Sequence, residues 1–272
     1  MPPKKRILFI TQQMAPYLEL SEYAGIANKL AVRSNETGLE VRVIMPKFGT
    51  INERRHRLHE VVRLSGINII IDNDDYPLII KVASLPTARL QVYFLDNEDY
   101  FKRKSVFNDE AGNFYEDNPN RAVFFCKGAL ETVKKFGWPP DIIHCSGWMT
   151  ALVPMYLKTA YKKEPVFANS KVVFSLEPPI FKEKLGDQFV KKAMISNLIR
   201  EKDMELFKEG TNASINRGAV KYADAVALAG EKVDHKLVED LKKEKGKLLL
   251  PYQKNNEDVS DYLHLYQQLL GK

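Results

Sequence analysis

The order of hydrophobic and polar positions predicts that the chain opens with alternating strands and helices. Residues 6–11 form a short apolar run typical of a buried strand. Residues 22–36 repeat apolar side chains at helical spacing, and Gly38 stands where such a helix would stop. A second apolar run follows at residues 41–45 and is ended by Pro46. Strand, helix and strand in this order predict a right-handed βαβ unit at the start of a parallel sheet.

The alternation of strands and helices is interrupted in the next part of the chain. Residues 58–71, 78–85 and 90–95 are rich in β-branched side chains, and turn residues such as the acidic run 72–75 separate them. This pattern is typical of antiparallel strands. We therefore expect a β-meander inserted into the α/β frame.

The second half of the chain returns to alternating helices and strands. The predicted helices span residues 118–136, 148–161, 186–208, 213–222, 232–245 and 258–270, and the predicted strands span 141–145, 171–176 and 225–229. The pattern predicts one doubly wound, Rossmann-like α/β domain over residues 1–250. A linker and an amphipathic helix are expected over residues 251–272. Ligands of such sheets bind at the carboxyl ends of the strands.

Composition removes several classes of protein from consideration. The chain has 272 residues, of which 44% are hydrophobic and 28% charged, as in ordinary globular domains. It has no apolar run near the roughly 18 residues that span a bilayer, so no membrane partner is expected. The net charge of +6 is spread over short clusters, which we interpret as solvated surface rather than a nucleic-acid site. The basic cluster 54–57 and His59 belong to this surface.

The cysteines and histidines indicate neither a disulfide scaffold nor a metal site. Cys126 and Cys145 are the two cysteines, and the five histidines show no ligand spacing. We expect no cofactor and a reducing, cytoplasmic location. His144 and Cys145 end a predicted buried strand, where a packed, hydrogen-bonded pair is the simplest interpretation.

Several separate segments resemble one known family and occur in that family's order. They are Ile7–Ile10 with Met14–Pro16, Val41–Pro46, Leu95–Phe101, Asp117–Phe125, Asp141–His144 with Trp148–Leu157, and Gly218–Asp224. Over roughly residues 5 to 235, the chain resembles the N-terminal, acceptor-side domain of bacterial glycogen synthases and plant starch synthases.

The resemblance implies one half of a GT-B fold. The family transfers glucose from ADP-glucose or UDP-glucose to the non-reducing end of an α-1,4-glucan, with retention. Its first Rossmann-like domain binds the acceptor glucan, and its second binds most of the sugar nucleotide. We expect this chain to represent the first domain only, because the residues after about 250 are too few to form the second.

The chain departs from the family where phosphate is handled. In place of the family's Lys-Thr-Gly-Gly-Leu it has Glu19-Leu20-Ser21-Glu22-Tyr23, so two carboxylates stand where a cation and glycines would meet a diphosphate. The lysine of the family's Phe-Leu-Lys-x-Gly is replaced within Ser214–Gly218, and Arg217 is displaced by one position. That displacement would turn Arg217 to another face of a helix.

The polar positions that would face the sugar also differ. The family's His-x-His-Asp-Trp-His segment keeps only His144 and Trp148. Glu177 stands where the family has a histidine that hydrogen-bonds the donor sugar. A carboxylate there is a nucleophile, a general base or a hydrogen-bonded loop residue.

Two functions follow from these departures. The first is a degenerate relative that is not catalytic alone and binds an α-glucan or another oligosaccharide, or docks on a protein partner in glucan metabolism. No catalytic residue is assigned. The candidate crevice residues are Tyr17, Glu19, Glu22, Tyr100, His144, Trp148 and Glu177.

The second function is an active glucosyltransferase completed by a separate chain that carries the nucleotide domain. Such a chain needs a hydrophobic docking surface. The C-terminal helix is the candidate, with an apolar stripe at Tyr262, Leu265, Tyr266 and Leu269. The alternative is that this stripe packs on the helix's own domain.

Overall fold

The computed structural model describes residues 3–86, 88–186, 188–195, 197–244, 246–254 and 258–271. Its strands are β1 (Arg6–Thr11), β2 (Glu40–Pro46), β3 (His59–Glu60), β4 (Ile67–Ile71), β5 (Asp74–Ser84), β6 (Gln91–Asp96), β7 (Ile142–Ser146), β8 (Lys171–Leu176), β9 (Ala225–Leu228) and β10 (Leu248–Leu250). Its helices are α1 (Tyr23–Glu36), α2 (Glu53–His56), α3 (Glu98–Phe101), α4 (Asn118–Phe136), α5 (Leu152–Lys158), α6 (Gln188–Ala193), α7 (Glu201–Met204), α8 (Asn212–Tyr222), α9 (His235–Lys243) and α10 (Ser260–Leu269). Short 3₁₀ turns lie at Trp148–Thr150, Pro165–Phe167 and Glu205–Phe207.

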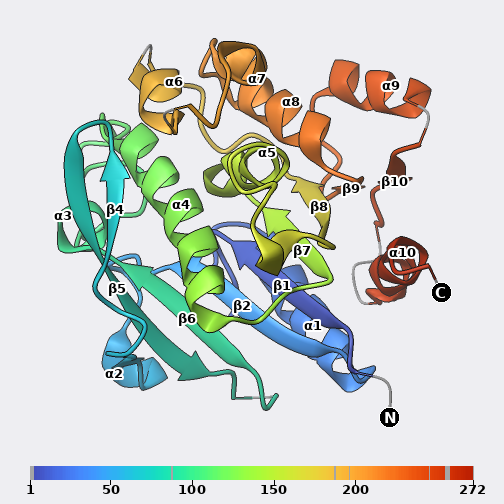
Figure 1. The fold of residues 1–272 in the computed structure, drawn as a ribbon, viewed down its shortest axis with the longest axis horizontal. Coiled ribbons are helices and arrows are strands. Elements are labelled where there is room, and N and C mark those ends of the chain that lie inside the picture. The colour runs from blue at the N-terminus through green and yellow to red at the C-terminus, as the bar shows by residue number, and fades with distance from the viewer. Residues whose placement is uncertain are drawn as a thin grey trace.

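The described strands form one sheet in the order β10-β9-β8-β7-β1-β2-β6-β5-β3, with β4 paired to β5 (Figure 1). The pairs from β10 to β6 are parallel, whereas β5 runs antiparallel to its neighbours β6, β4 and β3. The order turns back between β1 and β7, so β1 has β2 on one side and β7 on the other. The predicted doubly wound sheet with an antiparallel insertion is confirmed.

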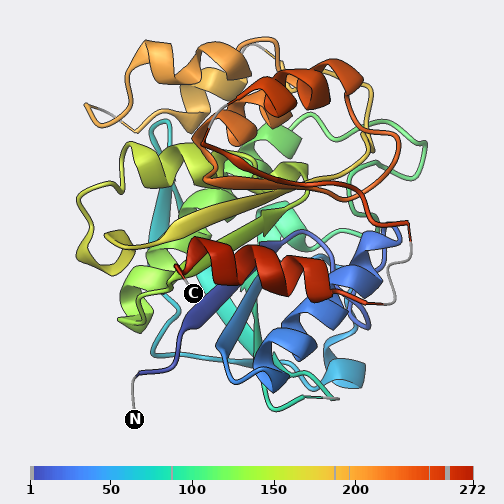
Figure 2. The ribbon, with the colours of Figure 1, turned by 90° about the vertical axis from the view of Figure 1, so that its right-hand side faces the viewer.

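Helices cover both faces of the sheet. Helices α4, α5 and α8 lie on one face, and α1 and α10 lie on the other (Figures 1 and 2). The central strands are buried between these layers, with Ile7, Leu8 and Ile10 of β1 fully inaccessible. Full burial on both faces explains why the parallel strands are continuous apolar runs rather than alternating ones.

Helix α10 packs on its own sheet. Tyr262, Leu265 and Tyr266 are buried, and the ring of Tyr266 meets that of Phe9 in β1 at 6.4 Å between centroids. The interpretation that the stripe packs on the helix's own domain is confirmed, and the alternative that these three residues form a docking surface is wrong. Leu269 is partly buried against the same core.

Three predicted elements are corrected by the structure. The long helix over 186–208 is instead α6, α7 and a 3₁₀ turn, because Gly186 and Asn197 adopt positive φ values of 76° and 62° that a helix interior excludes. The run 58–71 is two short strands separated by a turn, and the helix over 148–161 is a 3₁₀ turn followed by the shorter α5. Strand β10 was missed because three leucines are too short to signal a strand.

Among the residues that the structure describes, no helix has the length and apolar character that crossing a membrane would require.

Candidate functional site: a crevice at the carboxyl edge of the sheet

Strands β1, β7 and β8 end side by side and place a small group of polar side chains at the carboxyl edge of the sheet. Gln12 and Gln13 follow β1, Gly147 and Trp148 follow β7, and Glu177 follows β8. Because the strand order turns back between β1 and β7, this edge is where a ligand crevice is expected in a doubly wound sheet.

Gly147 and Gln12 fix the shape of this edge. Gly147 has a φ of 83°, and a Cβ atom built on it would lie 2.2 Å from Cδ of Gln12. The Gln12 side chain thus lies directly over the glycine, and its Oε1 accepts a hydrogen bond from the Met149 amide at 3.3 Å. Both the backbone conformation and the close approach require glycine at this position.

Glu177 is buried beside Gln13 and is only half satisfied. Gln13 Nε2 donates to Glu177 Oε2 at 3.0 Å, whereas Oε1 has no hydrogen-bond partner among the described residues. The Gln13 amide is held in this orientation because its own oxygen accepts from the amides of Leu20 and Ser21 at 2.9 and 2.8 Å. Burial raises the pKa of Glu177 to about 8, although the bond from Gln13 opposes the rise.

Trp148 supplies a second unsatisfied polar atom. Its ring is 4% exposed and packs against Phe107, Phe114 and Phe181. Its Nε1 has no hydrogen-bond partner among the described residues. Buried polar atoms are normally paired, so this unpaired donor is available to a water or a ligand.

Trp148 and Glu177 line the same cavity, which we call the edge cavity. Gln12, Gly147, Ser175, Pro178, Ile180, Asn212 and Asn216 complete its lining. Its volume of about 10 Å³ admits one water molecule or one hydroxyl group. None of these lining residues is a lysine or an arginine, so the edge cavity offers neutral amides, an indole N–H and a carboxyl group.

His144 lies beneath helix α10 rather than in the edge cavity. Its Nδ1 is 2.6 Å from the Tyr266 hydroxyl and its Nε2 is 2.7 Å from Ser175 Oγ. Ser175 Oγ accepts a hydrogen bond from the Tyr23 hydroxyl at 2.9 Å. Its own proton is therefore available for a hydrogen bond to His144 Nε2. Burial lowers the pKa of His144 to about 3, so the ring is neutral. The predicted hydrogen-bonded core histidine is confirmed.

Four other candidate residues also lie outside the lining of the edge cavity. Tyr17 is buried between His56 and Phe94, on the α1 face of the sheet. Tyr100 is buried against Tyr76 and Phe124. Glu19 and Glu22 are exposed on the loop after β1, which the Ser21 hydroxyl ties to Gln13 Nε2 at 2.7 Å.

Comparison with known proteins identifies the family. The sequence profile of the starch synthase catalytic domain matches residues 6–247. The chain belongs to this family. It is 34% identical over 234 residues to the glycogen synthase of Chlorobium phaeobacteroides, covering 83% of this chain and 48% of that protein. It is 41% identical over 172 residues to that of Chlorobium chlorochromatii, covering 63% and 35%.

A solved structure supports the same fold assignment. The catalytic domain of starch synthase IV from Arabidopsis thaliana, bound to ADP and acarbose, superposes with a TM-score of 0.72 at 17% identity. The match covers 92% of this chain and 52% of that one. The chain therefore has the glycogen and starch synthase type of GT-B domain, and it spans about half the length of the curated relatives it matches.

Asn216 lies at the position where the sequence resemblance implies a lysine in the family. Asn212 opens helix α8 and Asn216 follows one turn later, so both amides reach the edge cavity from one helix face. Asn216 Nδ2 donates to Asn212 Oδ1 at 2.9 Å. Arg217 instead pairs with Asp234 at 3.3 Å and does not line the edge cavity. The prediction that its displacement turns it away is confirmed.

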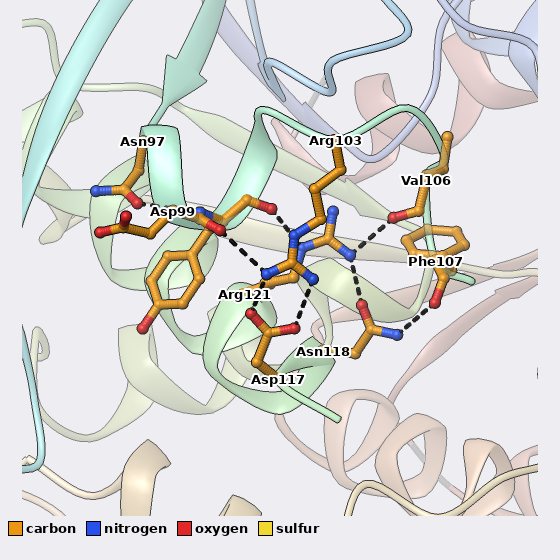
Figure 3. Close-up of polar contacts among 9 residues, drawn as sticks. Asn97, Asp99, Arg103, Val106, Phe107, Asp117, Asn118 and Arg121 are labelled. Carbon is orange, nitrogen blue, oxygen red and sulfur yellow. Dashed lines mark hydrogen bonds and ion pairs between the residues drawn. The ribbon is translucent and has the colours of Figure 1, made fainter. Parts of the chain in front are cut away.

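A buried arginine is bonded to the loop that carries Val106 and Phe107 (Figure 3). Arg121 of α4 is fully buried; its Nε donates to the Tyr100 carbonyl at 2.8 Å, and its Nη1 donates to the Val106 carbonyl at 2.7 Å. Asn118 Nδ2 donates to the Phe107 carbonyl at 2.8 Å in the same network. Burial lowers the pKa of Arg121 to about 10, so it remains a cation at neutral pH. The network fixes the backbone that carries Phe107 to Trp148.

Sequence reasoning missed the neutral residues of the edge cavity. The resemblance draws attention to charged positions of the family, whereas Gln12 and Asn212 of the cavity lining, and Gln13 beside Glu177, carry no charge. The available signal was their position, since Gln12 and Gln13 directly follow the first buried strand. Among the described residues, no three His, Cys, Asp or Glu side chains gather as a metal site requires.

Proposed function

We propose that this chain binds the end of an α-glucan at the edge cavity and does not transfer glucose by itself. The observation that carries the proposal is the lining of the cavity, which has two buried unpartnered polar atoms and no cationic side chain. The proposed domain covers residues 1–250, with 251–272 as its C-terminal linker and helix.

The polar groups of the cavity suit a sugar hydroxyl. A hydroxyl oxygen has two lone pairs and can accept two hydrogen bonds. Trp148 Nε1 can donate to it. Glu177, with a pKa of about 8, is mostly protonated at neutral pH. Because Oε2 accepts from Gln13, the carboxyl proton belongs on Oε1, which can also donate to the ligand oxygen.

The same lining disfavours a nucleotide diphosphate. A transferring or leaving phosphate needs positive charge from arginine, lysine or a metal ion. Asn216 is neutral where the family has lysine, and the loop after β1 presents the exposed carboxylates of Glu19 and Glu22. Two carboxylates near a diphosphate repel it, which favours a saccharide over a sugar nucleotide as the ligand.

The alternative is an active glucosyltransferase that uses ADP-glucose or UDP-glucose and is completed by a separate chain. In its favour, the starch synthase IV domain of similar fold binds ADP and acarbose. The partner would need a surface other than α10, since that helix is already packed on its own sheet. The partner would also have to supply the positive charge that a diphosphate requires, because no lysine or arginine lines the edge cavity.

A cytoplasmic location belongs to the same proposal. Cys126 and Cys145 are free and buried, which fits a compartment where thiols stay reduced.

Calorimetric titration with maltoheptaose tests the proposal. Asn216→Leu places an apolar side chain in the edge cavity. Arg217→Leu is the control, because it introduces leucine at the next position, which does not line the cavity. We expect saturable binding to the parent chain and to Arg217→Leu, and a loss of about tenfold or more in Asn216→Leu. Equal affinity in all three would show that the glucan does not use this cavity.

A further inference from the structure

A second and larger groove lies at the end of the sheet where β2 and β6 begin and β5 ends. We call it the basic groove. Its lining includes residues of α1, of α2 and of the loop between β5 and β6. Its volume is about 1300 Å³, and Val41 and Leu90 contribute to its apolar part. A hollow of this size is ample for a small organic ligand.

Arginines without acidic partners line the basic groove. Arg55, Arg57 and Arg89 are exposed lining residues, and none forms an ion pair with a described carboxylate. Outside the groove, arginines with carboxylate partners are Arg6, Arg33, Arg103, Arg200 and Arg217. These three guanidinium groups are therefore not neutralised by an ion pair with a described carboxylate.

The carboxylate that lines the basic groove is already engaged elsewhere. Glu40 Oε2 accepts from Arg6 Nε at 3.2 Å, and its Oε1 accepts from Trp138 Nε1 at 2.6 Å. Arg42 also lines the groove, but its guanidinium lies 4.7 Å from the ring centroid of Trp138 and is stacked there. Glu40 thus leaves Arg55, Arg57 and Arg89 available to a ligand.

A buried hydroxyl without a partner also lines the basic groove. Tyr17 is 6% exposed, and its phenolic oxygen has no hydrogen-bond partner among the described residues. Its ring meets that of His56, another lining residue, at 4.9 Å between centroids. An unsatisfied buried hydroxyl is a second, independent sign that a ligand or water completes the site.

From these observations we infer that the basic groove binds a small anion that carries phosphate groups. Guanidinium groups form paired hydrogen bonds with phosphate oxygens, so an arginine-lined groove matches this ligand better than a neutral sugar. The chemistry is opposite to that of the edge cavity, where no cation lines the wall. The chain therefore offers two sites with different ligands, one for sugar hydroxyls and one for phosphate.

Titration of the full chain with inorganic pyrophosphate and with ADP tests this inference. Pyrophosphate contains only the recognised group, whereas ADP shows whether an organic phosphate uses the same groove. Arg55→Gln with Arg57→Gln removes two lining cations. Arg54→Gln with Arg63→Gln removes two exposed cations that do not line the groove, so the net charge of both double variants is the same.

We expect saturable pyrophosphate binding that weakens about tenfold or more in the groove variant and less than about twofold in the control variant. Maltoheptaose affinity should be the same in both variants, which separates this inference from the proposed glucan site. Absence of saturable binding, or equal losses in the two double variants, would overturn the inference. Binding of a polyglutamate peptide without pyrophosphate binding would overturn it in favour of an acidic protein partner.

Discussion

Replacing Glu177 by glutamine should stabilise the protein at neutral and alkaline pH. Glutamine keeps the shape of the side chain and can still accept the bond from Gln13, but it cannot ionise. The parent carboxyl group is buried with one oxygen unpartnered, so its ionised form is poorly solvated in the folded chain. In the unfolded chain the same group is fully hydrated and ionises near its ordinary pKa of 4.5.

The sign and size of the effect follow from the pKa of Glu177 in the two states. The folded chain, with a pKa of about 8, binds a proton that the unfolded chain has released above pH 4.5. Stability therefore falls as pH rises from about 4.5 to 8, and the full cost of ionisation is about 5 kcal/mol. At pH 7 the folded chain keeps the proton on Glu177, whereas the unfolded chain has released it. The expected loss of unfolding free energy at this pH is about 3 kcal/mol.

Urea unfolding of the parent and of Glu177→Gln across this pH range measures the difference. The two chains should differ little near pH 5, and the variant should be more stable by about 3 kcal/mol near pH 7. Glu19→Gln, at an exposed carboxylate of the neighbouring loop, is the control and should follow the parent. If the free energy of unfolding changed with pH in the same way for the parent and for Glu177→Gln, the reasoning would be refuted.

Three further predictions concern the core. Tyr266→Phe removes the hydroxyl paired with His144 Nδ1 and should lower the free energy of unfolding in urea by about 2 kcal/mol. Amide hydrogens of α10 should then exchange faster, and unchanged exchange would contradict the prediction. Arg121→Leu leaves buried carbonyl groups unpaired and should lower the free energy of unfolding by about 3 kcal/mol or more. Residues 102–117 should then become susceptible to limited proteolysis, and a loop that stays resistant would contradict the prediction. Burial raises the pKa of Cys126 to about 12 and also raises that of Cys145. Neither thiol should therefore react with Ellman's reagent at pH 8 until urea unfolds the chain. Rapid reaction of the folded protein would contradict the prediction.

Local signals predicted the elements that they fully determine. Helix α4 has the predicted bounds, since Pro119 occupies its first turn and Gly137 ends it with a φ of 59°. Strand β8 also has its predicted bounds, because a fully buried parallel strand is a continuous apolar run. Elements that depend on tertiary contacts were less predictable, as the broken segment between Gly186 and Lys208 illustrates.

The candidate site was predictable in position but only partly in its residues. The carboxyl edge follows from the strand order, and Trp148 and Glu177 were correctly placed on it. His144 lies within β7, two residues before that strand ends, and its side chain points to the α10 face because neighbouring residues of a strand alternate between faces. Which polar atoms lack partners depends on packing across the fold, so the sequence could not single out Trp148 Nε1.

The indole signals of an ¹⁵N-labelled sample test the central claim most directly. The chain has two tryptophans. Trp148 Nε1 is unpartnered at the edge cavity, whereas Trp138 Nε1 donates to Glu40 and serves as an internal control. Maltoheptaose should shift the Trp148 indole signal in a saturable way and leave that of Trp138 in place, and ADP-glucose should leave the Trp148 signal in place. A saturable shift of the Trp148 signal with ADP-glucose, or none with maltoheptaose, would contradict the account.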